Sequence, residues 1–391
     1  WVFFILVAII TIQEVRVPAS AILWIFASAF LVYIGSLIGL GRGLYKATPN
    51  IYRENIANNQ SYEPRALRLP WLVQLTIICS LLGFLSVIIF VLSRGYGLSV
   101  FTSIRALSEM GNEVLSMRYG ESGYAEPAFV MYFYTINYVG AMLGGILFSS
   151  QKAIRYRIVA LLPILMISLL GLALVGRTII LVAVVLWLAS NFTTRVYLRK
   201  GFASIPVRLV IISTLCILAI AVVTQYLRYN LINLGSESIN ELLSRSHDTF
   251  AYLPAFGQWF VGHWQDSTPL TLGASSFARI YARIGIADVF VYDEVTVGNT
   301  KTNIFTIFRE LIDDFSPLGS MIWLFVIGII AGFTFRQISK GKIHFFPILL
   351  GFYAYVLFSQ TRTIFYYTSV LIALIIFTAY LLIPNRRKLK F

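Results

Sequence analysis

Uninterrupted apolar runs of about 20 residues recur along this chain, and a helix of that length spans the hydrocarbon core of a bilayer. The run IVALLPILMISLLGLAL at 158–174 shows no regular alternation of apolar and polar residues, which the strands of a membrane barrel would require. With 58% hydrophobic and 12% charged residues, the composition excludes an ordinary soluble domain. The sequence therefore predicts an all-α, polytopic integral membrane protein.

Ten apolar segments qualify as membrane spans, and they divide the chain into three parts. Residues 1–228 would hold seven helices and an extracytoplasmic segment at 93–128. Residues 229–316 would form one large, helical extracytoplasmic loop, and residues 317–391 would hold three helices and a cytoplasmic C-terminus. The first run begins at Trp1 without a methionine, so we expect part of the natural N-terminus to be missing. The ten spans are 1–12, 19–40, 71–92, 129–150, 158–175, 178–194, 208–228, 317–336, 345–361 and 363–383.

Positive charge is distributed unevenly between the two sets of connections. One set carries most of the Lys and Arg residues and has Glu54 and Glu63 as its acids. The positive-inside rule assigns this set to the cytoplasm, so the large loop lies on the opposite face. The net charge of +14 then reflects topology and anionic lipid, and no nucleic-acid partner is expected. The cytoplasmic connections are 41–70, 151–157, 195–208, 336–344 and 384–391.

The cations on the extracytoplasmic side are almost all arginines, with Lys301 as the exception. A planar guanidinium group binds phosphate through two parallel hydrogen bonds, so this bias indicates an anionic, phosphate-bearing ligand at the membrane surface. The alternative is that each arginine snorkels from a helix end to the interface. The candidates for anion binding are Arg177, Arg228, Arg245, Arg279, Arg283 and Arg362.

The large loop contains candidates for proton transfer and for carbohydrate contact. His247 beside Asp248 can accept a proton near neutral pH, or the two residues form a solvated turn. The aromatic residues Tyr252, Trp259 and Trp264 can pack against sugars, or they form an interfacial aromatic belt. The histidines and acids lack metal-ligand spacing, so no metal or cofactor is expected.

The segment FRELIDDFSPLG at 308–319 concentrates charge directly before a long apolar run. Helical spacing pairs Arg309 with Asp313 at i,i+4 and leaves Glu310 and Asp314 on a neighbouring face. The proline and glycine near its end predict a break before the membrane span. We therefore expect a short charged helix at the mouth of the bundle. It either carries reaction chemistry or is a charged collar that sets the depth of the next span.

The run from Thr302 to Gly319 resembles a motif of the Wzy family of O-antigen and capsular oligosaccharide repeat-unit polymerases. The motif reads TN-x-F/Y-T-x-x-R-x-x-x-x-D-F-x-x-x-G, and GRT at 176–178 is similar to the family's turn between two mid-chain helices. Family members commonly read DFG where this chain reads DFSPLG. The matching residues are Thr302, Asn303, Phe305, Thr306, Arg309, Asp314, Phe315 and Gly319.

The resemblance implies a GT-C-like helix bundle in the bacterial inner membrane, acting as a glycosyltransferase at its periplasmic face. It would transfer a glycan growing on undecaprenyl pyrophosphate to a new lipid-linked unit and release undecaprenyl pyrophosphate without a metal or cofactor. Membrane lipids and a chain-length regulator protein are further implied partners. The six arginines named above would bind pyrophosphate, and the three aromatic residues would bind sugar. The implied catalytic candidates are Arg309, Glu310, Asp314, His247 and Asp248.

Two other functions are compatible with the same residues. An O-antigen ligase shares this architecture and donor, and it would favour a catalytic histidine in the large loop, for which His247 is the candidate. A lipid-linked oligosaccharide flippase or transporter would place ionisable residues near the centres of its spans. In this chain the charges gather instead in one extracytoplasmic loop.

Overall fold

A computed structural model describes residues 17–41, 68–119, 128–198, 223, 251–263, 269–286, 292, 295–297, 300–303 and 305–382. Within these ranges the chain is mostly helical, and six helices are long and apolar enough to cross a membrane. They are α2 (Ala19–Leu40), α4 (Leu69–Ser93), α6 (Ala128–Ser150), α7 (Ile154–Ala173), α8 (Arg177–Tyr197) and α13 (Ile307–Ser339). Two shorter apolar helices are α14 (Phe346–Phe358) and α15 (Thr368–Leu382).

These helices confirm a multi-pass, helical membrane protein. The six long helices correspond to six of the ten predicted spans. The predicted spans 345–361 and 363–383 correspond to the shorter helices α14 and α15, which follow the 3₁₀ turns η5 (Ile343–Phe345) and η6 (Ile364–Tyr366). The predicted spans 1–12 and 208–228 lie outside the described residues.

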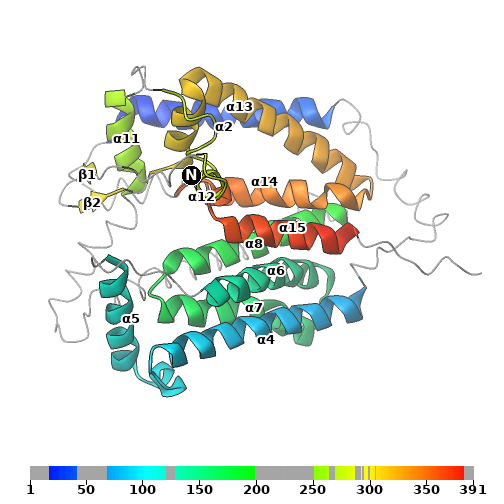
Figure 1. Cartoon of the computed structure of the whole chain (residues 1–391). Helices are drawn as coiled ribbons and strands as arrows, with labels where there is room; N and C mark the ends of the chain where they lie inside the picture. The colour runs from blue at the N-terminus through cyan, green and yellow to red at the C-terminus, as the bar shows by residue number, and fades with distance from the viewer. Residues whose placement is uncertain are drawn as a thin grey trace, which may run out of the picture.

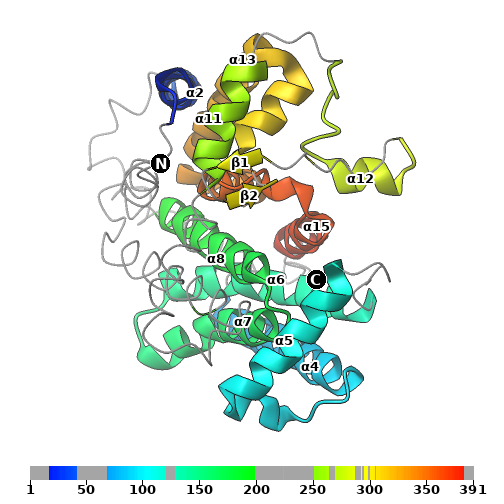
Figure 2. The same cartoon turned by 90° about the vertical axis from the view of Figure 1, so that its left-hand side faces the viewer.

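The helices run side by side in two groups that α14 and α15 join (Figure 1). One group holds α4, α6, α7 and α8, and the other holds α2 and α13 (Figure 2). Between them, α14 packs on both α8 and α13, and α15 packs on α6. The buried core is divided in the same way, since one cluster fills the first group with α14 and α15 and another lies between α2, α13 and the loop helix α11 (Tyr252–His263).

The contact between α2 and α13 is built on glycines spaced four residues apart. Gly35 and Gly39 lie on α2, and Gly328 and Gly332 lie on α13. A Cβ atom at any of the four would collide with a backbone carbonyl oxygen of the other helix. Small residues at this spacing let membrane helices approach closely enough for extensive van der Waals contact. The two helices run in the same direction, so their C-terminal residues lie at the same end of the bundle (Figure 1).

Hydrogen bonds between helices stabilise the other group. Asn137 of α6 donates through Nδ2 to the carbonyl of Pro163 in α7 over 2.9 Å, and the indole of Trp187 in α8 donates to the carbonyl of Ala160 over 3.0 Å. Polar side chains in a bilayer interior are stabilised by such partners, typically by about 1 kcal/mol each. These contacts fix α7 against both of its neighbours.

Several short elements gather at one end of the bundle, opposite to the end at which α2 and α13 finish (Figure 1). They are the turn η2 (Leu98–Thr102) and helix α5 (Ile104–Tyr119), then α11, α12 (Ala278–Arg283), and an antiparallel pair of strands, β1 (Val295–Val297) and β2 (Thr300–Thr302). The expectation of a purely helical loop is wrong at these strands. Their alternation of β-branched residues around Gly298 and Asn299 is typical of a hairpin.

The acidic residues of the described chain all belong to elements at this end. Glu109 and Glu113 lie on α5, and the other three lie in the first two turns of α13. The opposite end carries basic residues such as Arg68, Lys152 and Lys340. The described acids and these basic residues therefore lie at opposite ends of the bundle, and the assignment of either end to the cytoplasm stays a prediction.

Candidate functional site

The first two turns of α13 form a separate helical segment, because the helix is interrupted at Ser316. That residue has φ 67° and ψ 169°, a conformation that costs a non-glycine residue about 1–3 kcal/mol. Pro317 disfavours helical geometry in the residue before it. The Ser316 hydroxyl then accepts a hydrogen bond from the Gly319 amide over 3.3 Å and caps the membrane-spanning part. The predicted break is confirmed, and we call residues 307–315 the collar helix.

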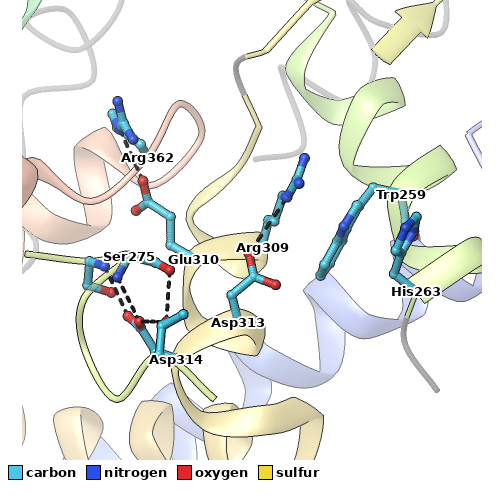
Figure 3. Close-up of polar contacts among 10 residues, drawn as sticks. Trp259, His263, Ser275, Arg309, Glu310, Asp313, Asp314 and Arg362 are labelled. Atoms are coloured by element: carbon cyan, nitrogen blue, oxygen red, sulfur yellow. Dashed lines mark hydrogen bonds and ion pairs between the residues drawn. The ribbon is translucent and has the colours of Figure 1, made fainter. Parts of the chain in front are cut away.

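Glu310 of the collar helix is almost completely buried and holds the turn between α14 and α15. Arg362 donates through Nε to one carboxylate oxygen over 3.0 Å, and the backbone amide of Thr363 donates to the other over 2.6 Å (Figure 3). Both oxygens are therefore engaged by donors on a turn 52 residues further along the chain. A buried carboxylate needs such compensation, since its desolvation is costly.

Asp314, one turn after Glu310, holds the loop that precedes α12. Its carboxylate accepts hydrogen bonds from the Thr271 hydroxyl and from the backbone amides of Ser275 and Ser276, at 2.9 Å and 3.0 Å (Figure 3). In the same contact the amides of Thr271 and Leu272 donate to the last carbonyls of the collar helix. Asp314 is fully buried, so its geometry is that of a structural group rather than of a proton acceptor open to a substrate.

Arg362 and Arg279 meet at a single tyrosine ring. The guanidinium carbon of Arg362 lies 3.3 Å from the centroid of the Tyr366 ring, and that of Arg279 lies 5.2 Å from the same centroid. Arg279 is exposed, and the side chain of Arg362 is 23% exposed. Two sequence-predicted anion-binding residues, 83 positions apart, are thus brought together in an electropositive patch.

Arg309 lies on the other face of the collar helix, among aromatic rings. Its guanidinium carbon is 3.9 Å from the ring centroid of Phe305, 4.0 Å from that of Tyr292 and 5.0 Å from that of Trp259. Its Nε lies 3.7 Å from a carboxylate oxygen of Asp313, so the predicted i,i+4 pair is confirmed. Burial and nearby carboxylates raise the pKa of Tyr292 well above its ordinary value, which keeps this phenol neutral.

Asp313 differs from the other two acids because its side chain is 17% exposed. His263, at the end of α11, lies close enough for its charge to act on Asp313. The imidazole of His263 also stacks on Trp259, with ring centroids 5.8 Å apart. No local pattern in the sequence connects His263 with the collar helix.

Trp259 is sandwiched between the guanidinium of Arg309 and the ring of His263 (Figure 3). It is 7% exposed and belongs to the core between α2, α11 and α13. Because these neighbours cover the indole, the predicted contact between Trp259 and a sugar does not fit the geometry. The residue instead fixes the position of Arg309.

The remaining predicted residues are placed as follows. Arg177 begins α8 and lies near Tyr252 of α11. Burial raises the pKa of Tyr252, and the positive charge of Arg177 opposes part of this shift. Arg283 is exposed one turn after Arg279, at the end of α12, and Gly285 follows with φ 71°. The predicted residues outside the described chain are His247, Asp248, Arg228, Arg245 and Trp264.

Sequence reasoning missed the aromatic residues that organise these charges. Tyr292 meets Arg309 through a tertiary contact that no local pattern predicts. Phe305 and Tyr366 each lie four residues from the arginine they contact, and although Phe305 belongs to the motif, sequence reasoning gave neither ring a role beside an arginine. Among the described residues no group of three or more His, Cys, Asp or Glu side chains is placed to hold a metal. Comparison with protein-family models, with curated proteins and with solved structures finds no match for this chain.

Proposed function

We propose that this protein is an integral-membrane glycosyltransferase that polymerises undecaprenyl-pyrophosphate-linked oligosaccharide repeat units at the periplasmic face of the bacterial inner membrane. The observation that carries the proposal is the pair formed by Arg279 and Arg362 against Tyr366. Two guanidinium groups at one bundle end suit a diphosphate leaving group at the membrane surface. The run that resembles the Wzy-family motif, residues 302–319, includes the collar helix, whose Glu310 contacts Arg362.

The second part of the proposal concerns the acceptor. Of the three acids on the collar helix, Asp313 is the one with a partly exposed carboxylate, whereas the carboxylates of Glu310 and Asp314 are buried and accept hydrogen bonds. In the proposed step the acceptor hydroxyl loses its proton to Asp313 and forms the new glycosidic C–O bond. The bond between the donor sugar and the diphosphate breaks, and the diphosphate leaves with the electron pair. Arg309 orients Asp313.

The test is gel analysis of surface glycan from a strain that lacks this protein. Loss of the polymer ladder, with single repeats still attached to the outer lipid, is the expected result. Accumulation of unattached lipid-linked polymer would show an O-antigen ligase instead. Complete loss of extracytoplasmic glycan would show a flippase, and an unchanged ladder would exclude all three.

A further inference from the structure

Two buried acids of the collar helix, Glu310 and Asp314, lie four residues apart and are therefore on one helix face. Their side chains are held by donors from two different parts of the chain, residues 362–363 for Glu310 and residues 271–276 for Asp314. Both carboxylates are also buried, so their remaining lone pairs are not open to a substrate hydroxyl. The two acids instead determine where those other segments lie.

Glu310 sets the position of Arg362. The 3.0 Å contact engages Nε of Arg362, so the terminal nitrogens of the guanidinium group can donate to a ligand. The adjacent amide of Thr363 donates to the second oxygen of Glu310, and Thr363 in turn accepts a hydrogen bond from the Phe365 amide. The whole turn up to η6, which contains Tyr366, is thereby tied to the collar helix.

Asp314 sets the position of Arg279. The amides of Ser275 and Ser276 that donate to its carboxylate lie just before α12, whose second residue is Arg279. The ring of Phe277 stacks on that of Phe365 with centroids 6.1 Å apart. The start of α12 is therefore held both to the collar helix and to the turn that carries Tyr366.

We infer that Glu310 and Asp314 are positioning residues that hold Arg362 and Arg279 against Tyr366, so that two guanidinium groups bind one diphosphate group. This inference rests on the proposed function in taking the ligand to be a diphosphate. It assigns neither acid a role in proton transfer. It also explains why two carboxylates occupy the interior of a patch that attracts anions.

The two roles that a carboxylate can have beside an anion site predict effects of opposite sign. As a fixed negative charge, each acid repels a bound diphosphate, so neutralising it would tighten binding. As a positioning residue, each acid holds an arginine in a geometry that accepts the ligand, so neutralising it would weaken binding. The sign of the change in affinity therefore separates positioning from simple charge.

The experiment uses the full chain in detergent micelles and inorganic pyrophosphate as the probe, with affinity measured by calorimetry. Wild-type protein is expected to bind pyrophosphate, and Glu310→Gln and Asp314→Asn are each expected to bind it about tenfold more weakly. Glu109→Gln is the matched control, because it removes one exposed carboxylate at the same end of the bundle, on α5. Tighter binding by either variant, or no binding by wild-type protein, would overturn the inference.

A double-mutant cycle tests whether each acid acts through its arginine. In an Arg279→Ala background, Asp314→Asn should cause little further loss of affinity, because the group it positions is already gone. Arg279 is exposed, so its substitution leaves the core intact. Independent losses that multiply in the double variant would contradict a positioning role.

Arg362→Lys provides a second route should Glu310→Gln fail to accumulate as folded protein. It keeps the charge but replaces the guanidinium fork with a point charge, so about tenfold weaker pyrophosphate binding is expected. Affinity equal to that of wild type would overturn the inference at this arginine.

The surface-glycan assay separates this inference from the proposed function. If Glu310→Gln weakens pyrophosphate binding but the deletion strain keeps its polymer ladder, the positioning role stands and the polymerase proposal fails. If the ladder is lost in the deletion strain but Glu310→Gln binds pyrophosphate more tightly, the polymerase proposal stands and the positioning role fails.

Discussion

At the scale of single residues, the three acids of the collar helix have different surroundings although they lie within five positions of one another. Glu310 and Asp314 are buried and accept hydrogen bonds from the backbone of other segments. Asp313 lies on a neighbouring face of the helix, where it meets Arg309 and is partly exposed. The sequence predicted the pairing of Arg309 with Asp313 because it depends on helical spacing alone.

Asp313→Asn tests the proposed proton acceptor. It keeps the size of the side chain but removes its basicity, so polymer formation should fall by about a hundredfold or more. Pyrophosphate binding should be retained, because Arg279 and Arg362 are held from the other face of the helix. The measurement is surface-glycan ladder length alongside pyrophosphate calorimetry. Full-length polymer from this variant would exclude Asp313 as the base.

Ser316→Gly tests the strain at the end of the collar helix. Glycine adopts a positive φ without a Cβ penalty, so this variant should be more stable than wild type by about 1 kcal/mol. Ser316→Ala keeps the strained conformation and loses the hydroxyl that caps Gly319, so it should be less stable by about 1 kcal/mol. Thermal unfolding in detergent measures both. An alanine variant more stable than the glycine variant would contradict this account.

At the scale of helices, the glycine contact between α2 and α13, called the seam below, anchors the collar helix. The collar helix and the glycines Gly328 and Gly332 belong to the same helix, α13. Adding a methyl group at Gly328 would place it against the carbonyl of Val32. Glycine pairs spaced four apart can be read from the sequence as a packing signal. Which two helices share the seam is a tertiary fact, because α2 and α13 are separated by most of the chain.

Gly328→Ala should destabilise the protein by roughly 1–3 kcal/mol, because the backbones of α2 and α13 must move apart. Gly262→Ala is the matched control, since it adds the same methyl group on α11 with no neighbour within 4 Å of the new atom. The control should be slightly stabilising because alanine has the higher helix propensity. Equal thermal stability of the two variants would argue against a close seam.

At the scale of the whole molecule, the described elements place acids and most functional candidates at one end of the bundle. The large loop contributes α11, α12 and the strand pair there, and α5 adds a further element at the same end (Figure 1). The described basic residues Arg68, Lys152 and Lys340 lie at the other end. This arrangement predicts which positions an impermeant reagent can reach.

Cysteine labelling in intact cells tests this orientation. In a background with Cys79 and Cys216 replaced by alanine, Arg283→Cys should react with a membrane-impermeant maleimide. Lys340→Cys should react only after the membrane is opened, because positively charged connections are retained in the cytoplasm. Both positions are exposed in the structure. The reverse pattern of labelling would invert the proposed topology.

The sequence by itself determined the helical membrane class and the break before the membrane-spanning part of α13, because each depends on composition or on spacing within one segment. It also singled out Arg279 and Arg362 as candidates for anion binding. The tertiary structure alone decided that Arg279 and Arg362 share Tyr366, that Glu310 and Asp314 hold them, and that Trp259 packs on Arg309. Apart from Arg362 and Tyr366, these contacts join residues tens of positions apart. Which residues meet depends on how the helices pack, and no local sequence pattern predicts it.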